Sequence, residues 1–178
     1  MNTLTESPTT QDVRLSPDEF KAAFRDHPAG VAVITADAGH GPVALTATSV
    51  ASVSADPPLI VFSVSEISSS SPTIRAASTL VVHLLGVDQL HLAKLGATSG
   101  IDRFADESLW EVLPTGETYF PDARTWIRAR VVDVIVAAGS AVVLVEALEA
   151  KPGDDTQHEP LVYHNRTWHR LGDHSRID

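Results

Sequence analysis

Short apolar runs separated by turn-forming residues recur along most of the chain. Three of them, Gly30–Thr35, Leu59–Ser63 and Thr79–Leu85, are rich in β-branched and aliphatic side chains. Runs of this length and composition predict buried strands. The longer stretch Thr125–Glu149 is apolar on both sides of Ala138-Gly139-Ser140, which predicts one long hairpin turning at these three residues.

Three further regions are predicted to form strands. Val43–Ser54 is built from small and hydroxylated residues and carries almost no charge. Asp56-Pro57-Pro58 is predicted to end the strand pairing of this region, because proline has no backbone N–H to donate to a neighbouring strand. Pro160–His164 and Thr167–Leu171 are predicted as the last two strands.

Helices are few and short. Ser16 can cap a helix in which Pro17 takes the first position and Glu19 completes a capping box. His27-Pro28 ends this helix, since the residue before a proline disfavours helical backbone. The apolar residues of the helix share one face: Phe20, Ala23 and Phe24.

Two more short helices are predicted farther along the chain. One is Pro72–Ala77, and the other is Asp88–Leu95, which Gly96 is predicted to stop. Strands therefore outnumber helices, and hairpins join most of them. This pattern favours a mainly β (α+β) antiparallel barrel over a doubly wound parallel sheet.

The chain has 178 residues, a length that suits one domain. Residues 1–14 are polar and predict a disordered leader, followed by the domain at 15–172 and a tail at 173–178. Residues 1–11 lack the basic and apolar regions of a signal peptide, and no apolar run is long enough for a membrane span. We therefore expect a soluble, cytoplasmic protein that does not enter a membrane.

Charge and cysteine content narrow the chemistry. The 13 Lys and Arg against 23 Asp and Glu give a net charge of −10, which argues against a nucleic-acid partner. The absence of cysteine excludes disulfides, thiolate zinc sites, iron–sulfur clusters and a thiol nucleophile. His169 and His174 lack the spacing of a metal motif, so no metal is predicted. Redox chemistry in this chain would therefore need a bound organic cofactor or a metal site without cysteine.

Hydroxyl groups are concentrated in two segments. Five of the nine residues in Thr46–Ser54 are Ser or Thr, and so are seven of the eleven in Ser63–Thr73. Small side chains let a ligand approach the backbone, and O–H and N–H groups can surround a phosphate without a lysine. The alternative is a Ser/Thr-rich strand followed by a solvated loop.

The order of these segments resembles the flavin reductase-like family of FMN- or FAD-binding proteins, which act as the reductase component of two-component flavin-dependent monooxygenases. The resemblance covers nearly the whole chain and is carried by these segments: His27–Thr35, Leu45–Leu59, Ser68–Ser70, Leu80–His83, Asp102–Phe104, Pro160–His164 and Trp168. It implies a Greek-key split β-barrel and a homodimer with the flavin near the subunit interface.

The resemblance also implies which residues bind the flavin. One group would line the ribityl chain and the ring edge: Thr46, Ala47, Thr48, Ser49, Ser52, Val53 and Ser54. Ser68, Ser69 and Ser70 would hold the phosphate, with Arg103 as the cationic partner. For Arg103 the alternative is an ion pair with Asp102 or Asp106, and Phe104 is predicted to be a core residue rather than a stacking platform.

Two positions depart from the family pattern. Gly139-Ser140-Ala141 stands where many members have Gly-Asp-His, so the histidine near the nicotinamide is missing, and His83 replaces a frequent asparagine. His164 and Ser140 remain as candidates near the nicotinamide. Apart from these candidates, no catalytic side chain is assigned.

The sequence thus predicts an NAD(P)H:flavin oxidoreductase that passes hydride from NADH or NADPH to FMN or FAD. The reduced flavin would then diffuse to a partner monooxygenase. Two alternatives stay open. One is a flavin carrier or redox sensor of the same fold, and the other is a ligand-free interaction barrel with its serines on the surface.

Overall fold

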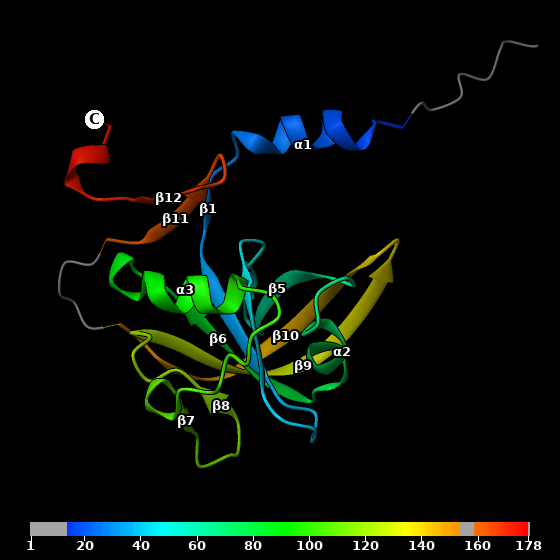
Figure 1. Cartoon of the computed structure of the whole chain (residues 1–178), viewed down its shortest axis with the longest axis vertical. Coiled ribbons are helices and arrows are strands. Elements are labelled where there is room, and N and C mark those ends of the chain that lie inside the picture. Colours follow the sequence, from blue (N-terminus) through cyan, green and yellow to red (C-terminus); the bar gives the residue numbers. More distant parts are fainter. Residues whose placement is uncertain (1–13, 154–158, 178) are drawn as a thin grey trace, which may run out of the picture.

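The computed structural model describes residues 14–153 and 159–177, so most of the predicted leader lies outside the described residues. Its main element is a seven-stranded antiparallel sheet in the order β3-β2-β6-β9-β10-β5-β4 (Figure 1). The strands are β2 Ala32–Ala36, β3 Val43–Ala47, β4 Ala51–Ala55, β5 Pro58–Ser65, β6 Thr79–Leu84, β9 Thr125–Ala137 and β10 Ser140–Lys151. Residues 48–50 join β3 to β4, so the two edges of the sheet curl together as a split barrel.

Two smaller sheets and a few helices surround this barrel. The remaining strands are β1 Ala29–Gly30, β11 Leu161–His164 and β12 Thr167–Arg170 in one sheet, and β7 Glu111–Val112 with β8 Thr118–Tyr119 in the other. The helices are α1 Pro17–Arg25, α2 Ser71–Ala76 and α3 Leu90–Ala97, with 3₁₀ turns at Val87–Gln89, Glu107–Leu109 and Asp173–Ser175. The mainly antiparallel fold with short helices is confirmed. Within the described residues, no helix has the length and apolar character needed to cross a bilayer.

Strand β2 is buried along its whole length because each of its faces carries a hydrophobic core. Ile34 faces the barrel interior, whereas Val33 faces a second core that contains Leu92 of α3. Phe104 belongs to this second core and stacks on Phe120 with ring centroids 5.7 Å apart. The prediction that Phe104 is a core residue is confirmed.

Helix α3 does not end at Gly96, so that prediction is wrong. The helix continues through Gly96 to Ala97. A Cβ at position 96 would lie 2.5 Å from Oγ1 of Thr46 on β3. The glycine is needed because α3 lies directly against β3, and not because the helix stops there.

The β9–β10 hairpin forms as predicted and turns at Ala138-Gly139, with φ of 44° and 88°. In Figure 1 its outer end extends beyond the rest of the sheet. Ile135 and Val142 are directly paired near this end and are 58% and 37% exposed. The hairpin therefore presents apolar side chains to its surroundings.

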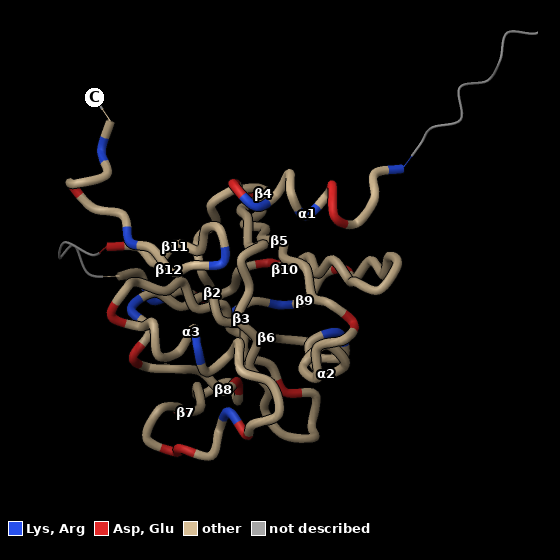
Figure 2. The backbone as a smooth tube through the Cα atoms, turned by 45° about the horizontal axis from the view of Figure 1, so that its top comes forward, with Lys and Arg blue, Asp and Glu red and all other residues tan. Residues whose placement is uncertain are grey.

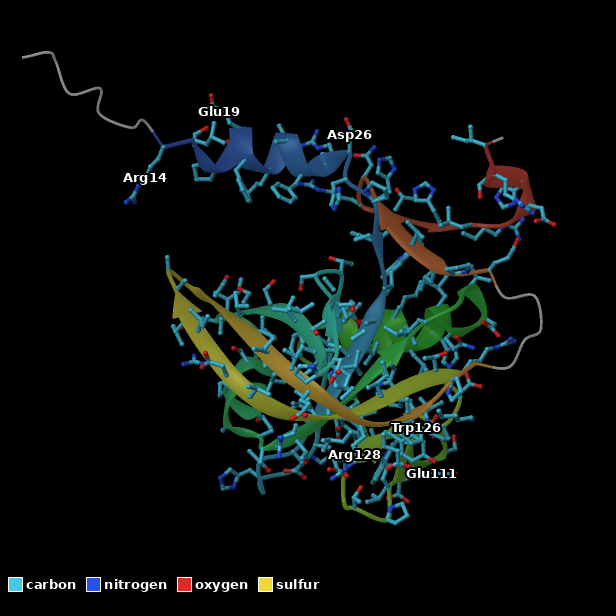
Figure 3. The ribbon with its side chains drawn as sticks, turned by 180° about the vertical axis from the view of Figure 1, so that it is seen from behind. Arg14, Glu19, Asp26, Glu111, Trp126 and Arg128 are labelled. Atoms are coloured by element: carbon cyan, nitrogen blue, oxygen red, sulfur yellow. The ribbon has the colours of Figure 1, made fainter. Side chains whose placement is uncertain are left out.

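Helix α1 begins with the predicted capping box. Ser16 Oγ accepts the Glu19 N–H at 3.3 Å, and a Glu19 carboxylate oxygen accepts the Ser16 N–H at 2.9 Å. No residue of α1 is buried, and Phe20 and Phe24 are 53% and 57% exposed. Figures 1 and 3 show the helix standing away from the barrel, joined to it through β1.

Candidate functional site

Four of the predicted flavin-binding residues line one cavity of about 460 Å³. They are Thr46 at the end of β3, Ser68 and Ser69 before α2, and Arg103 after α3. The remaining lining residues are small or apolar: Leu45, Ile67, Gly96, Ala97, Ser99 and Gly100. The fold thus brings together hydroxyl groups and a guanidinium from segments far apart in the sequence.

Arg103 is anchored by the end of α3. Its Nη2 donates to the Thr98 carbonyl at 2.7 Å and its Nε donates to the Leu95 carbonyl at 3.3 Å. Among residues 14–153 and 159–177, no carboxylate lies within 4.0 Å of this guanidinium. Asp102 and Asp106 instead accept the backbone N–H groups of residues 104 and 108, so the ion pair weighed as an alternative does not form. The positive charge is available to an anion in the cavity.

The contact between Thr46 and α3 shapes the wall of this cavity. Thr46 Oγ1 donates to the Ala93 carbonyl at 2.6 Å, and Gly96 lets the helix backbone approach the threonine. The wall at residues 96–100 was not predicted from the sequence. Its signal was the run of small residues Gly96-Ala97-Thr98-Ser99-Gly100, which ends shortly before Arg103.

Ser70 is not among the residues that line this cavity. Its side chain is fully buried, and Oγ donates to the Ala44 carbonyl at 2.9 Å. This hydroxyl links the start of α2 to β3. Its neighbour Ser71 is also buried, and its Oγ has no partner within the described part of the chain.

A second cavity, of about 480 Å³, lies beyond the end of β3. Thr48 and Ser49 line it from the barrel side, and Phe20 and Phe24 line it from α1. Its other lining residues come from α1, the following segment and the β11–β12 hairpin: Lys21, Arg25, His27, Ala29, Tyr163, His164, Asn165 and Arg166. The cavity therefore has an aromatic wall and a basic rim.

Strand β3 leads from one cavity to the other. Thr46 lines the first cavity and Ser49 the second, and three residues can span at most about 11 Å. This separation suits one elongated ligand with a phosphate at one end and a planar ring at the other. Gly96, where a side chain would fill the wall, and the Ser68, Ser69 and Arg103 donors fit such a phosphate.

Of the two candidates near the nicotinamide, only His164 lies at the second cavity. Its Nε2 is 3.9 Å from an Asp26 carboxylate oxygen, and its ring lies 5.5 Å from that of His169. Ser140 lies at the exposed start of β10, paired with Ser65, and lines neither cavity. The structure does not bring the two candidates together.

The other predicted ligands lie outside both cavities. Ala47 is buried in the barrel core, and Ser52 and Val53 are exposed on the edge strand β4. The Ser54 hydroxyl is bonded to the backbone of Asp56. Ser49 does line the second cavity, but its hydroxyl is bonded to the backbone of residue 63 and holds β5 against the bend after β3.

His83, at the position of the family asparagine, is a buried structural residue. Its Nδ1 lies 2.9 Å from the Val33 carbonyl, and its Nε2 accepts the Phe120 N–H at 3.1 Å. Burial lowers the pKa of His83 to about 4, although the Val33 hydrogen bond acts in the opposite direction. The neutral ring therefore ties β6 to β2 and to the segment after β8.

The fold is a split barrel, and its two cavities together suit an elongated organic ligand that bears a phosphate. The chain belongs to the flavin reductase-like family, because the model of the "Flavin reductase like domain" matches residues 24–172.

Known proteins agree with this assignment. An NADH:FMN oxidoreductase of Rhodococcus qingshengii is 46% identical over 154 residues, which are 85% of this chain and 80% of that protein. The reductase component of a 4-nitrophenol 4-monooxygenase/4-nitrocatechol 2-monooxygenase from Rhodococcus opacus is 28% identical over 161 residues, 89% of this chain and 84% of that protein. The crystal structure of a flavin reductase domain protein from Arthrobacter sp. FB24 is 35% identical and superposes with a TM-score of 0.83, covering 90% of this chain and 97% of the other.

Proposed function

We propose that the chain is an NAD(P)H-dependent flavin reductase that transfers hydride from NADH to FMN. The observation that carries the proposal is the pair of cavities on β3, one with phosphate-binding groups and one with aromatic walls. The Rhodococcus qingshengii relative bears the name of this activity. In this reaction the nicotinamide supplies the hydride and the flavin ring accepts it.

The side chains of the protein bind and orient the two reactants. Arg103, Ser68 and Ser69 hold the flavin phosphate, which fixes the ring end of the flavin beyond Thr46. Thr48 and Ser49 lie where the ring enters the second cavity. Hydride transfer needs no protein proton donor, so orientation and partial exclusion of water are the contribution of the chain.

The proposal includes a homodimer with the flavin close to the subunit interface. Residues 134–145 contain no Asp, Glu, Lys or Arg, and the hairpin end is uniformly tan in Figure 2. Ile135 is paired with Val142, and Val142 with Ser63, whose backbone binds the Ser49 hydroxyl. This row leads from exposed apolar side chains to the second cavity. A second copy on the apolar hairpin would therefore border the ring end of the site.

A partner monooxygenase would use the reduced flavin. The Rhodococcus opacus relative is named as the reductase component of a monooxygenase, which supports this role. Transfer by diffusion requires no contact surface for the partner. The cytoplasmic location and the absence of nucleic-acid and membrane partners remain predictions from the sequence.

Two measurements on purified protein test the proposal. Titration with FMN, followed by fluorescence, should show saturable binding, which a ligand-free interaction barrel would not give. Addition of NADH, and separately NADPH, should then bleach the visible flavin band with multiple turnovers. Bound FMN that stays oxidised with both donors would overturn the reductase and favour the carrier or sensor.

A further inference from the structure

The second cavity carries more positive charge than flavin binding requires. Lys21, Arg25 and Arg166 line it, whereas none of the described lining residues is Asp or Glu. The whole chain has 13 Lys and Arg and a net charge of −10. A cluster of three cations at one small cavity therefore stands out against the charge of the protein.

Among the described residues, no side chain or backbone group accounts for the charge of Arg25 or Arg166. Within the parts of the chain that the structure describes, neither guanidinium has a hydrogen bond or an ion pair. Lys21 lies 3.6 Å from Asp18, and both of these side chains are largely exposed. A second carboxylate, that of Asp26, lies 3.9 Å from Nε2 of His164.

The backbone at Arg166 gives an independent reason to assign a function to its side chain. Asn165 and Arg166 form the two-residue turn between β11 and β12, with φ of 46° and 62°. Turns with two left-handed residues favour Asn-Gly, because glycine has no Cβ to clash. The β9–β10 turn of this same chain has Gly139 at the second position. At the β11–β12 turn, an arginine occupies the strained position instead.

The position of these cations relative to the flavin ring indicates what they bind. Thr48 and Ser49 mark the end of the cavity that receives the ring in the proposed function. A dihydronicotinamide stacked on that ring is itself uncharged, and the negative charge that follows it in the dinucleotide is the pyrophosphate. Guanidinium groups suit phosphate oxygens because they donate paired, charge-assisted hydrogen bonds. A cavity of about 480 Å³ also has the size of a small-molecule site.

We propose that Arg25 and Arg166 bind the pyrophosphate of the nicotinamide dinucleotide and so hold the hydride donor against the flavin. This inference rests on the proposed reductase function. It places the binding site of the hydride donor in the second cavity, between α1 and the β11–β12 hairpin. Figure 3 shows Asp26, at the end of α1, beside this hairpin.

Arg166→Gly gives the sharpest test, because it removes the cation and creates the favoured Asn-Gly turn. The variant should melt at the same temperature as the wild type or higher, while its KM for NADH rises about 10-fold. Arg25→Gln should raise this KM similarly. Calorimetry should show a matching loss of NAD⁺ affinity, which reports on binding without turnover. Arg170→Gln is the matched control, because Arg170 is 3.3 Å from Glu159 and does not line the cavity.

The choice of hydride donor separates pyrophosphate binding from a general loss of structure at the cavity. Dihydronicotinamide riboside carries the same hydride without any phosphate. The proposal predicts that, in both Arg166→Gly and Arg25→Gln, kcat/KM for NADH falls relative to kcat/KM for the riboside. An equal loss with the two donors would show a structural effect and overturn the proposal, as would an unchanged KM and NAD⁺ affinity.

A loss confined to NADPH would assign the cations to its 2′-phosphate and would also overturn the pyrophosphate assignment. A wild-type protein that reduces flavin with none of these donors would instead contradict the reductase function itself.

Discussion

Gly96 of α3 and Thr46 of β3 are so close that a methyl group on the glycine would lie 2.5 Å from Oγ1 of the threonine. The backbone nitrogen of Thr46 would be 3.0 Å from the same methyl group, so rotating the threonine side chain cannot relieve the clash. This contact joins two walls of the first cavity, where the flavin phosphate is proposed to bind. The geometry of the proposed flavin site therefore depends on the absence of one side chain.

Gly96→Ala should push α3 away from β3. Overpacking of this kind costs about 1–3 kcal/mol, so we expect a lower melting temperature together with weaker FMN binding. FMN affinity measured by fluorescence titration checks the second effect. Gly30→Ala is the control, because no atom lies within 4 Å of a Cβ built there. Unchanged FMN affinity in Gly96→Ala would show that the helix contact does not shape the site.

Arg103→Gln should weaken the binding of FMN but not of riboflavin, which lacks the phosphate. A hydrogen bond to a charged group contributes about 1.5–3 kcal/mol, which corresponds to a loss of FMN affinity of about 10- to 150-fold. Titrations with the two flavins measure the difference. Arg75→Gln serves as the control, since Arg75 pairs with Glu66 at 3.4 Å outside the cavity. Equal losses for both flavins would contradict a phosphate contact.

His83 should make the fold sensitive to acid. Its pKa is about 4 in the folded chain, below the ordinary value of 6.5, so the unfolded chain binds more protons between these values. The stabilising contribution is complete above pH 6.5 and is lost progressively as the pH falls from 6.5 to 4. At pH 5.5 the loss is about 1 kcal/mol.

Urea unfolding of the wild type and of His83→Asn at pH 7.5 and 5.5 measures this contribution. We expect the free energy of unfolding to fall less in the variant than in the wild type over this interval. His40→Asn, at an exposed turn, should keep the wild-type dependence. Parallel losses in wild type and His83→Asn would mean that the buried imidazole is not the acid-sensitive group.

Ile135→Asp should dissociate the proposed homodimer. A charge placed in an apolar interface is costly, so the dimer dissociation constant should rise about 30-fold or more. Sedimentation velocity over a range of concentrations measures it. Val112→Asp, on the exposed strand β7 away from the hairpin, should leave the assembly unchanged. A wild type that is monomeric at high concentration would rule out the interface.

The sequence predicted the strands well because their apolar runs are short, β-branched and bounded by turn residues. The β9–β10 hairpin and the capping box at Ser16 depend on local chemistry, and both were found. Gly96 was misread, because a glycine required by a neighbouring strand has the same sequence signal as a helix end. That distinction depends on Thr46, which lies fifty residues earlier.

The candidate site was predictable in part for a related reason. Hydroxyl density located the segments of Ser68 and Thr46, but it could not show which hydroxyls face a ligand. Ser70 and Ser54 instead bond to nearby backbone groups. The basic rim of the second cavity could not be found in the sequence, because Arg25 and Arg166 come together only when α1 meets the β11–β12 hairpin.

Hydride transfer between two bound ligands can be followed by single-turnover reduction of the FMN-bound protein with NADH in the absence of oxygen. The flavin band should bleach in one phase that saturates with NADH, and deuterium at the transferred position of the nicotinamide should slow that phase. A saturable, isotope-sensitive phase would show that hydride passes between two ligands held side by side in the protein. A flavin band that remains oxidised, or that bleaches no faster than free FMN with NADH, would contradict a reductase site at the two cavities.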